Sequence, residues 1–134
     1  GYIDKANKEK VIVEARMVVM AAQTEASSLY GKAGAGNNLS TATPDSLNAA
    51  AAEAIKLAEM SGKEVGATAT LTNEGKVEKA IYTNSLYTVV YENGSYNVYD
   101  VNGADVGTDK KATLNEFALT VGGKTGKATI DSST

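Results

Sequence analysis

The sequence contains no cysteine and no histidine, and it has a single proline, Pro44. The absence of cysteine excludes a disulfide framework and a thiolate nucleophile. The absence of histidine removes the usual general base and the commonest metal ligand. Most enzyme mechanisms therefore lose the residues on which they usually depend. We expect the protein to be neither an enzyme nor the carrier of a cofactor or metal centre.

Long runs of apolar residues and clusters of basic residues are also missing. No apolar run reaches the ~18 residues that span a bilayer, and no signal peptide is recognisable. No cluster of Lys or Arg indicates nucleic acid or an anionic membrane as a partner. The 134 residues carry a net charge of −3, with 43% hydrophobic and 22% charged residues, a composition typical of one folded domain. We predict a single domain over 1–134, with an N-terminal helix (1–30), a loop and short helix (31–62), and a sheet with the C-terminal region (63–134).

The first 30 residues are the most informative stretch. Between Gly1 and Gly31 they contain neither glycine nor proline, which predicts one helix ~44 Å long that ends at Gly31. Its apolar residues fall on two arcs instead of one stripe. The broader arc contains Val11, Ile12, Ala15, Val18, Val19, Ala22, Ala26, Leu29 and Tyr30. The narrower arc contains Ile3, Ala6, Val13, Met17, Met20 and Ala21.

A helix with two apolar faces requires two partners. We predict that the broader arc packs on the chain's own sheet through Val11, Val18, Ala22 and Leu29. The narrower arc is then left for another helix or subunit, and its predicted assembly face consists of Ile3, Ala6, Val13, Met17 and Met20. The alternative is that one small core buries both arcs. Glu14, on a polar seam between the arcs, is either solvated or paired with Arg16 or a neighbouring subunit's lysine.

The rest of the chain predicts a loop, a short helix and an antiparallel sheet. A loop over 31–43 leads to a helix that Thr43 caps and Gly62 ends. Alternating residues from Val65 onward, with turns at 73–75 and 93–94, predict a meander of about four strands. Two further strand-like pieces, 117–121 and 128–130, either add an edge strand or run back against the first helix. The expected fold class is α+β, a long N-terminal helix on an antiparallel meander.

Two stretches resemble ligand sites only in part. Residues 122–125 (GGKT) resemble the end of a phosphate-binding loop, but the motif's first glycine would fall at Ala118 and no helix follows. We interpret them as a turn. Asp100, Asn102, Asp105 and Asp109 lack the spacing of an EF-hand. A looser calcium loop is the functional interpretation of this group, and a solvated turn is the simpler one.

Five tyrosines are crowded into three neighbouring predicted strands: Tyr82, Tyr87, Tyr91, Tyr96 and Tyr99. Such a set could stack on sugar rings or on a partner surface. The simpler interpretation is that cross-strand tyrosine pairs stabilise the sheet with half-buried rings and hydroxyls in water.

The stretch YIDKANKEKVIVEARMVVMAAQTEASSLY resembles the second half of the long N-terminal helix of a type IV pilin. The hairpin IYTNSLYTVVYENGSYNVY is similar to pilin sheets from Gram-positive anaerobes such as Clostridioides difficile. Such pilins carry a preceding apolar helix half with a prepilin-peptidase site, which maps to no residue here, so the chain reads like part of a longer protein. Many Gram-negative pilins close a C-terminal loop with a cystine, and its absence here fits the Gram-positive branch.

The resemblance implies the function of a major pilin, the structural subunit of a surface filament for adhesion, twitching motility or biofilm formation. It implies as partners further copies of the chain, minor pilins and the pilus assembly machinery, and no nucleic acid. It places the full-length precursor in the cytoplasmic membrane and the assembled subunit outside the cell. The alternatives are a minor pilin, a type II secretion pseudopilin, or a surface module that binds sugar or calcium.

Overall fold

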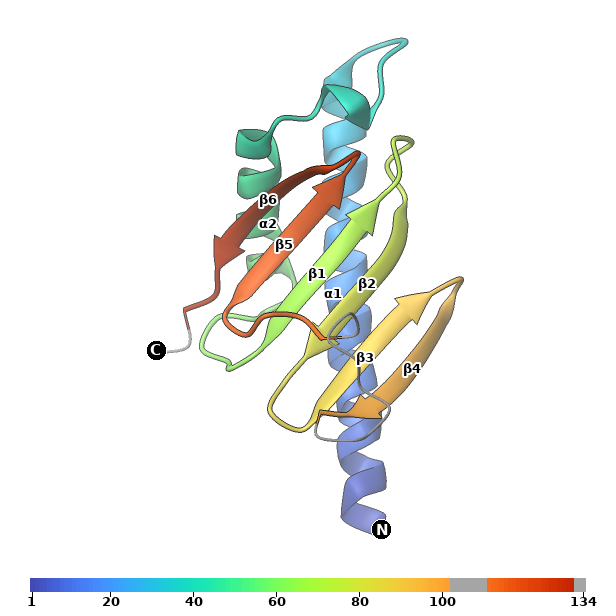
Figure 1. Ribbon diagram of the computed structural model, residues 1–134, viewed down its shortest axis with the longest axis vertical. Helices are drawn as coiled ribbons and strands as arrows, with labels where there is room; N and C mark the ends of the chain where they lie inside the picture. Colours follow the sequence, from blue (N-terminus) through green and yellow to red (C-terminus); the bar gives the residue numbers. More distant parts are fainter. Residues whose placement is uncertain (102–110, 132–134) are drawn as a thin grey trace.

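The computed structural model of the chain describes residues 1–101 and 111–131. It contains the helices α1 (Tyr2–Ala33) and α2 (Pro44–Leu57), with a 3-10 turn, η1 (Leu39–Thr41), between them. The strands are β1 (Gly66–Leu71), β2 (Val77–Thr83), β3 (Tyr87–Glu92), β4 (Ser95–Asp100), β5 (Glu116–Val121) and β6 (Lys124–Thr129). Both helices lie on the same face of one sheet, and the first turns of α1 project beyond the sheet (Figure 1). The predicted α+β class, a long helix on a mostly antiparallel sheet, is confirmed.

The six strands have the order β4-β3-β2-β1-β5-β6. Strands β1 to β4 form the predicted antiparallel meander, and Asn93 and Gly94 both take positive φ (54° and 78°) in the hairpin turn. The C-terminal pieces extend this sheet. Strand β5 runs parallel to β1, with Phe117 opposite Ala67, and β6 pairs with β5 across the turn at 122–123. The predicted turn in the GGKT stretch is therefore correct.

Helix α1 is longer than the sequence predicted, because Gly31 does not end it. The helix continues through Gly31 and ends at Gly34, which has a φ of 87°. A single exposed glycine costs a helix about 1 kcal/mol, which a long packed helix tolerates, whereas a glycine with positive φ is a common helix end. The predicted loop also contains a core residue, since Leu39 in η1 is fully buried.

Helix α2 begins as predicted and ends earlier. The Thr43 hydroxyl accepts a hydrogen bond from the Ser46 N–H (3.1 Å), and the Ser46 hydroxyl accepts one from the Thr43 N–H (2.9 Å), which is a capping box. The predicted end at Gly62 is wrong. The chain leaves the helix at Glu59, whose φ is 55°, and the Met60 N–H donates to the Ile55 carbonyl (3.0 Å). This pair of features is a Schellman motif with a glutamate in the place of the usual glycine.

The substitution Glu59→Gly is therefore expected to stabilise the domain by about 0.5–1 kcal/mol, because only glycine takes a left-handed conformation without steric cost. Urea unfolding at pH 7 measures the change. The matched control is Glu64→Gly, an exposed glutamate without a positive φ, which should gain nothing. Equal stability of the two variants would show that Glu59 is not strained.

The main core lies between the helices and the sheet. Its largest fully buried side chains are Phe117, Leu39, Leu47, Met60, Leu119 and Ile130. Helix α2 approaches β6 closely at Gly126, where an added Cβ would lie 2.4 Å from the Leu47 carbonyl carbon and the Asn48 amide nitrogen. The Asn48 side chain accepts a hydrogen bond from the Lys127 N–H (2.8 Å) at the same place. The C-terminal hairpin is thus fixed against α2.

Candidate functional site

The candidate assembly surface is the face of α1 that points away from the sheet. We call the five residues predicted for assembly (Ile3, Ala6, Val13, Met17 and Met20) the outward strip. Ile3 is 77% exposed, Val13 54% and Met20 68%, and Ala6 is exposed as well. Met17 differs, because it is only partly exposed and packs against the main core. Its unbranched, flexible side chain can reach the core from the flank of the helix.

The opposite face of α1 supplies the packing against the sheet. Val11, Val18 and Ala22 are buried, and Leu29 is half-buried against the same core. Ala21, which the sequence placed on the narrower arc, is also buried in this core. The interpretation of two arcs is wrong at this residue, because α2 packs beside α1 and covers more of its surface than the sheet alone would. Over the described residues, no helix is long and apolar enough to cross a membrane.

Polar side chains on α1 also bind the sheet, which the sequence reasoning missed. The Tyr82 hydroxyl donates to the Glu14 carboxylate (3.0 Å), and the Tyr87 hydroxyl donates to Asp4. Further along the helix, Gln23 donates to the Gly75 carbonyl (2.7 Å) and accepts from the Val77 N–H (3.1 Å). Glu14, which the sequence placed on a polar seam, is therefore hydrogen-bonded to the sheet, and the contacts of Asp4 and Gln23 hold α1 at two further places along its length.

The tyrosine cluster has two parts. Tyr91 and Tyr96 form the expected cross-strand pair, with ring centroids 4.8 Å apart, and the Arg16 guanidinium lies 5.5 Å above the Tyr96 ring. Tyr82 and Tyr87 are buried, and the expectation that their hydroxyls lie in water is wrong. The sequence did show acidic residues in the helix and tyrosines in the strands, which can form hydrogen bonds. It does not show which acid lies opposite which tyrosine.

The surroundings of Tyr82 and Tyr87 raise the pKa of both tyrosines, and the contact with Tyr87 lowers the pKa of Asp4. Burial, and then the adjacent Glu14 carboxylate, raises the pKa of Tyr82 far above its usual range. The hydrogen bond to Asp4 raises the pKa of Tyr87 to about 12. The same bond, followed by that from Lys8, holds the pKa of Asp4 below its ordinary value.

Stability is consequently expected to fall above pH 10. The tyrosine in the unfolded chain loses its proton near pH 10, whereas folded Tyr82 keeps its proton at higher pH, so rising pH favours the unfolded state. Tyr82 alone should contribute a slope that is small at pH 9 and rises toward about 1.4 kcal/mol per pH unit at pH 11. Urea unfolding between pH 9 and 11 measures this slope, which Tyr82→Phe should reduce and Tyr2→Phe, at a residue 90% exposed, should not. An unchanged slope in Tyr82→Phe would contradict the account.

The residues singled out as possible ligand sites have other contacts or lie outside the described chain. Lys124 of the GGKT turn donates to the carbonyls of Ser40 (2.7 Å) and Ala42 (2.6 Å) and so holds η1 against the sheet. Asp100 ends β4, and the other three residues of the predicted calcium group, Asn102, Asp105 and Asp109, fall outside the described residues. Within 1–101 and 111–131 no three acidic side chains are grouped to hold a metal ion.

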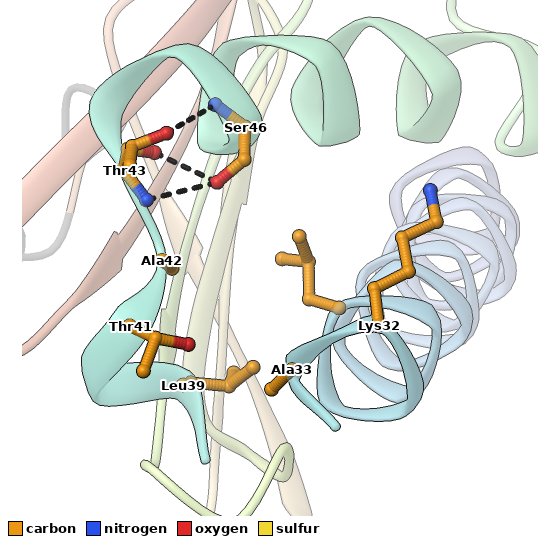
Figure 2. Close-up of a pocket in the computed structure, with 8 residues that line it drawn as sticks. Lys32, Ala33, Leu39, Thr41, Ala42, Thr43 and Ser46 are labelled. Atoms are coloured by element: carbon orange, nitrogen blue, oxygen red, sulfur yellow. Dashed lines mark hydrogen bonds between the residues drawn. The ribbon is translucent and has the colours of Figure 1, made fainter. Parts of the chain in front are cut away.

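A shallow pocket of about 200 Å³ lies between the end of α1, η1 and the start of α2. Figure 2 shows Leu39 and Ala33 on its apolar side and Lys32 at its edge. The hydroxyls of Thr43 and Ser46 line it, but both take part in the capping box of α2 (Figure 2). The pocket therefore offers a ligand mainly apolar contacts.

Comparison of the chain with protein-family models, curated proteins and solved structures found no match. A function is therefore inferred from the residues and contacts of the chain itself, above all from the outward strip.

Proposed function

We propose that this chain is the major structural subunit of a type IV pilus, which polymerises through α1 into a surface filament for adhesion, twitching motility or biofilm formation. The observation that carries the proposal is the outward strip. On a 32-residue helix whose other face is buried, Ile3, Val13 and Met20 each expose more than half of their surface. Large exposed apolar side chains gathered on one face of a helix in this way mark protein or membrane interaction sites.

The proposed partners are further copies of the chain, minor pilins and the assembly machinery. The proposed location is a filament outside the cell, built from a precursor held in the cytoplasmic membrane. A minor pilin or secretion pseudopilin would have the same surface, so abundance in the filament separates these roles. A sugar-binding role receives less support, because Tyr82 and Tyr87 direct their hydroxyls to α1.

The test is mass spectrometry of filaments sheared from the cells that make the protein. We expect this chain to be the dominant species and its native N-terminal peptide to carry an N-methylated residue that opens an apolar segment. A chain that is present only in traces would be a minor pilin. Absence from the sheared fraction, or an ordinary secretory N-terminus, would reject the filament function.

A further inference from the structure

The two edges of the sheet differ in how their backbone is covered. Strand β6 forms one edge, and its Lys127 N–H donates to the Asn48 side chain of α2 (2.8 Å). The same strand carries a second lysine, Lys124, and α2 lies closely against its Gly126. Lysines and a covering element are means by which proteins prevent an edge strand from pairing with another chain. The β6 edge is therefore protected.

Strand β4 forms the other edge of the sheet (Figure 1). The two-residue turn at 93–94 fixes which residues of β4 bond to β3, because hydrogen-bonded residues alternate along an antiparallel pair. The alternation continues to Val101, whose N–H donates to the Leu86 carbonyl (3.1 Å). The residues between direct their N–H and C=O groups away from β3, and within the described chain these groups have no hydrogen-bond partner. They are Tyr96, Val98 and Asp100.

The β4 edge also lacks the features that discourage strand addition. The strand contains neither proline nor lysine, and its six residues pair with β3 without a bulge. Its two tyrosines and its valine favour extended structure. An unprotected edge of this kind can accept a strand from another chain through main-chain hydrogen bonds.

A second copy of β4 fits this edge, because the strand is complementary to itself. In an antiparallel pair with Val98 opposite Val98 of the second copy, the outward N–H and C=O groups of both strands meet. On the face that carries the helices, Tyr96 then lies opposite Asp100 of the second copy. On the other face, Asn97 lies opposite Tyr99. No like charges face each other in this register, which would otherwise weaken the pairing.

Charge favours this register over its neighbours. The Arg16 guanidinium lies 5.5 Å from the centre of the Tyr96 ring, and neither Arg16 nor Asp100 forms an ion pair within residues 1–101 and 111–131. With Tyr96 opposite Asp100 of the second copy, the Asp100 carboxylate comes next to Arg16, and two-fold symmetry repeats the pair. A shift of two residues places Asp100 opposite Val98 or, in the other direction, opposite Gly94.

We propose that two copies of this chain pair edge to edge through antiparallel β4 strands, about a two-fold axis at Val98, with Arg16 of each copy facing Asp100 of the other. The contact joins two sheets of six strands into one sheet of twelve. The two α1 helices of the pair run in opposite directions, so this contact differs from any contact between parallel copies within one filament. It goes beyond the proposed filament function and does not use the outward strip.

The substitution Val98→Pro tests the edge directly. The Val98 N–H points away from β3, so proline removes a hydrogen bond between copies and leaves the pairing with β3 in place. Sedimentation equilibrium of the chain at about 0.1 mM is expected to show dimers, and Val98→Pro should lower the association constant at least tenfold. The matched control is Val98→Thr, which keeps the N–H and the branched side chain and should change association less than threefold.

Single introduced cysteines report the register, because the chain contains no cysteine of its own. Val98→Cys is expected to form a disulfide-linked dimer under mild oxidation, since Cα atoms directly opposite each other in a hydrogen-bonded pair are about 5.5 Å apart. Asn97→Cys and Tyr99→Cys report the two registers shifted by two residues, and neither should give more than a tenth of that product. A dimer formed mainly by either of these variants would overturn the register.

Reversal of the paired charges gives a measurement that does not depend on how the fold tolerates proline. Arg16→Glu and Asp100→Arg are each expected to lower the association constant at least fivefold, because each places like charges together twice in the pair. The combination Arg16→Glu/Asp100→Arg restores opposite charges and should recover at least half of the original constant. A double variant no better than the single variants would contradict the pairing.

The outcomes also separate this inference from the proposed function. A chain that stays monomeric, or a dimer that Val98→Pro does not weaken, would overturn the β4 contact. Val13→Glu, in the outward strip, should leave the dimer unchanged. If it dissociated the dimer instead, the copies would associate through α1 and the β4 contact would be wrong. Neither result changes the filament function, which depends on the presence of the chain in sheared filaments.

Discussion

Val13→Glu is expected to prevent this chain from entering the proposed filaments while leaving its domain folded. Val13 is 54% exposed, so a glutamate there should change the free energy of unfolding by no more than about 0.5 kcal/mol. An unpaired carboxylate buried at a contact between copies would cost several kcal/mol. Because this cost recurs at every such contact along a filament, assembly should fall far more than tenfold.

The matched control is Leu57→Glu, an apolar residue of similar exposure (49%) on α2 and outside the outward strip. It should leave filament yield within a factor of two. Sheared-filament yield measures assembly, and circular dichroism of the soluble domain checks the fold. Met17 is unsuitable for the same test, because it packs against the core and its replacement would weaken the domain itself. Normal filaments from Val13→Glu would remove the outward strip from the interface.

Gly126→Ala is expected to destabilise the domain by about 3 kcal/mol, the largest effect that we predict for a single methyl group. The added Cβ would lie 2.4 Å from backbone atoms of Leu47 and Asn48, so α2 as a whole must move away from β6. That movement also stretches the hydrogen bond from the Lys127 N–H to Asn48.

The same methyl group has the opposite effect elsewhere in the chain. Gly31 lies inside α1 with no atom within 4 Å of an added Cβ, so Gly31→Ala should stabilise the domain by about 0.5–1 kcal/mol through helix propensity. Urea unfolding of both variants measures the difference. If Gly126→Ala unfolded at the same urea concentration as the original chain, the contact between α2 and β6 could not be as close as described.

The sequence predicted the elements well where local chemistry decides them. Thr43 and Pro44 start α2, and Asn93-Gly94 turns β3 into β4, because each acts on its immediate neighbours. Local signals failed where tertiary packing decides the outcome. Gly31 resembles a helix end, but the packed helix continues through it, and Glu59 ends α2 although no sequence rule favours glutamate there.

Long-range pairing was beyond sequence reasoning for a different reason. The alternation in 116–121 indicates a strand but does not say which strand lies beside it, and the partner proved to be β1, where Ala67 lies opposite Phe117, 50 residues later. The same limit explains the missed contacts of Glu14 and Asp4 with tyrosines. Their residue types were visible, but only the placement of α1 across β2 and β3 brings donor and acceptor together.

The parallel pairing of β5 with β1 has a consequence for synthesis of the chain. Strand β1 is in place between its two neighbours only when the final hairpin, residues 116–129, has left the ribosome. Until then one edge of β1 and the inner face of α2 are uncovered, and an open strand edge is a template for pairing with other chains. A nascent chain that stalls before residue 116 would therefore be prone to aggregation, and the hairpin over 116–129 acts as the step that closes the fold.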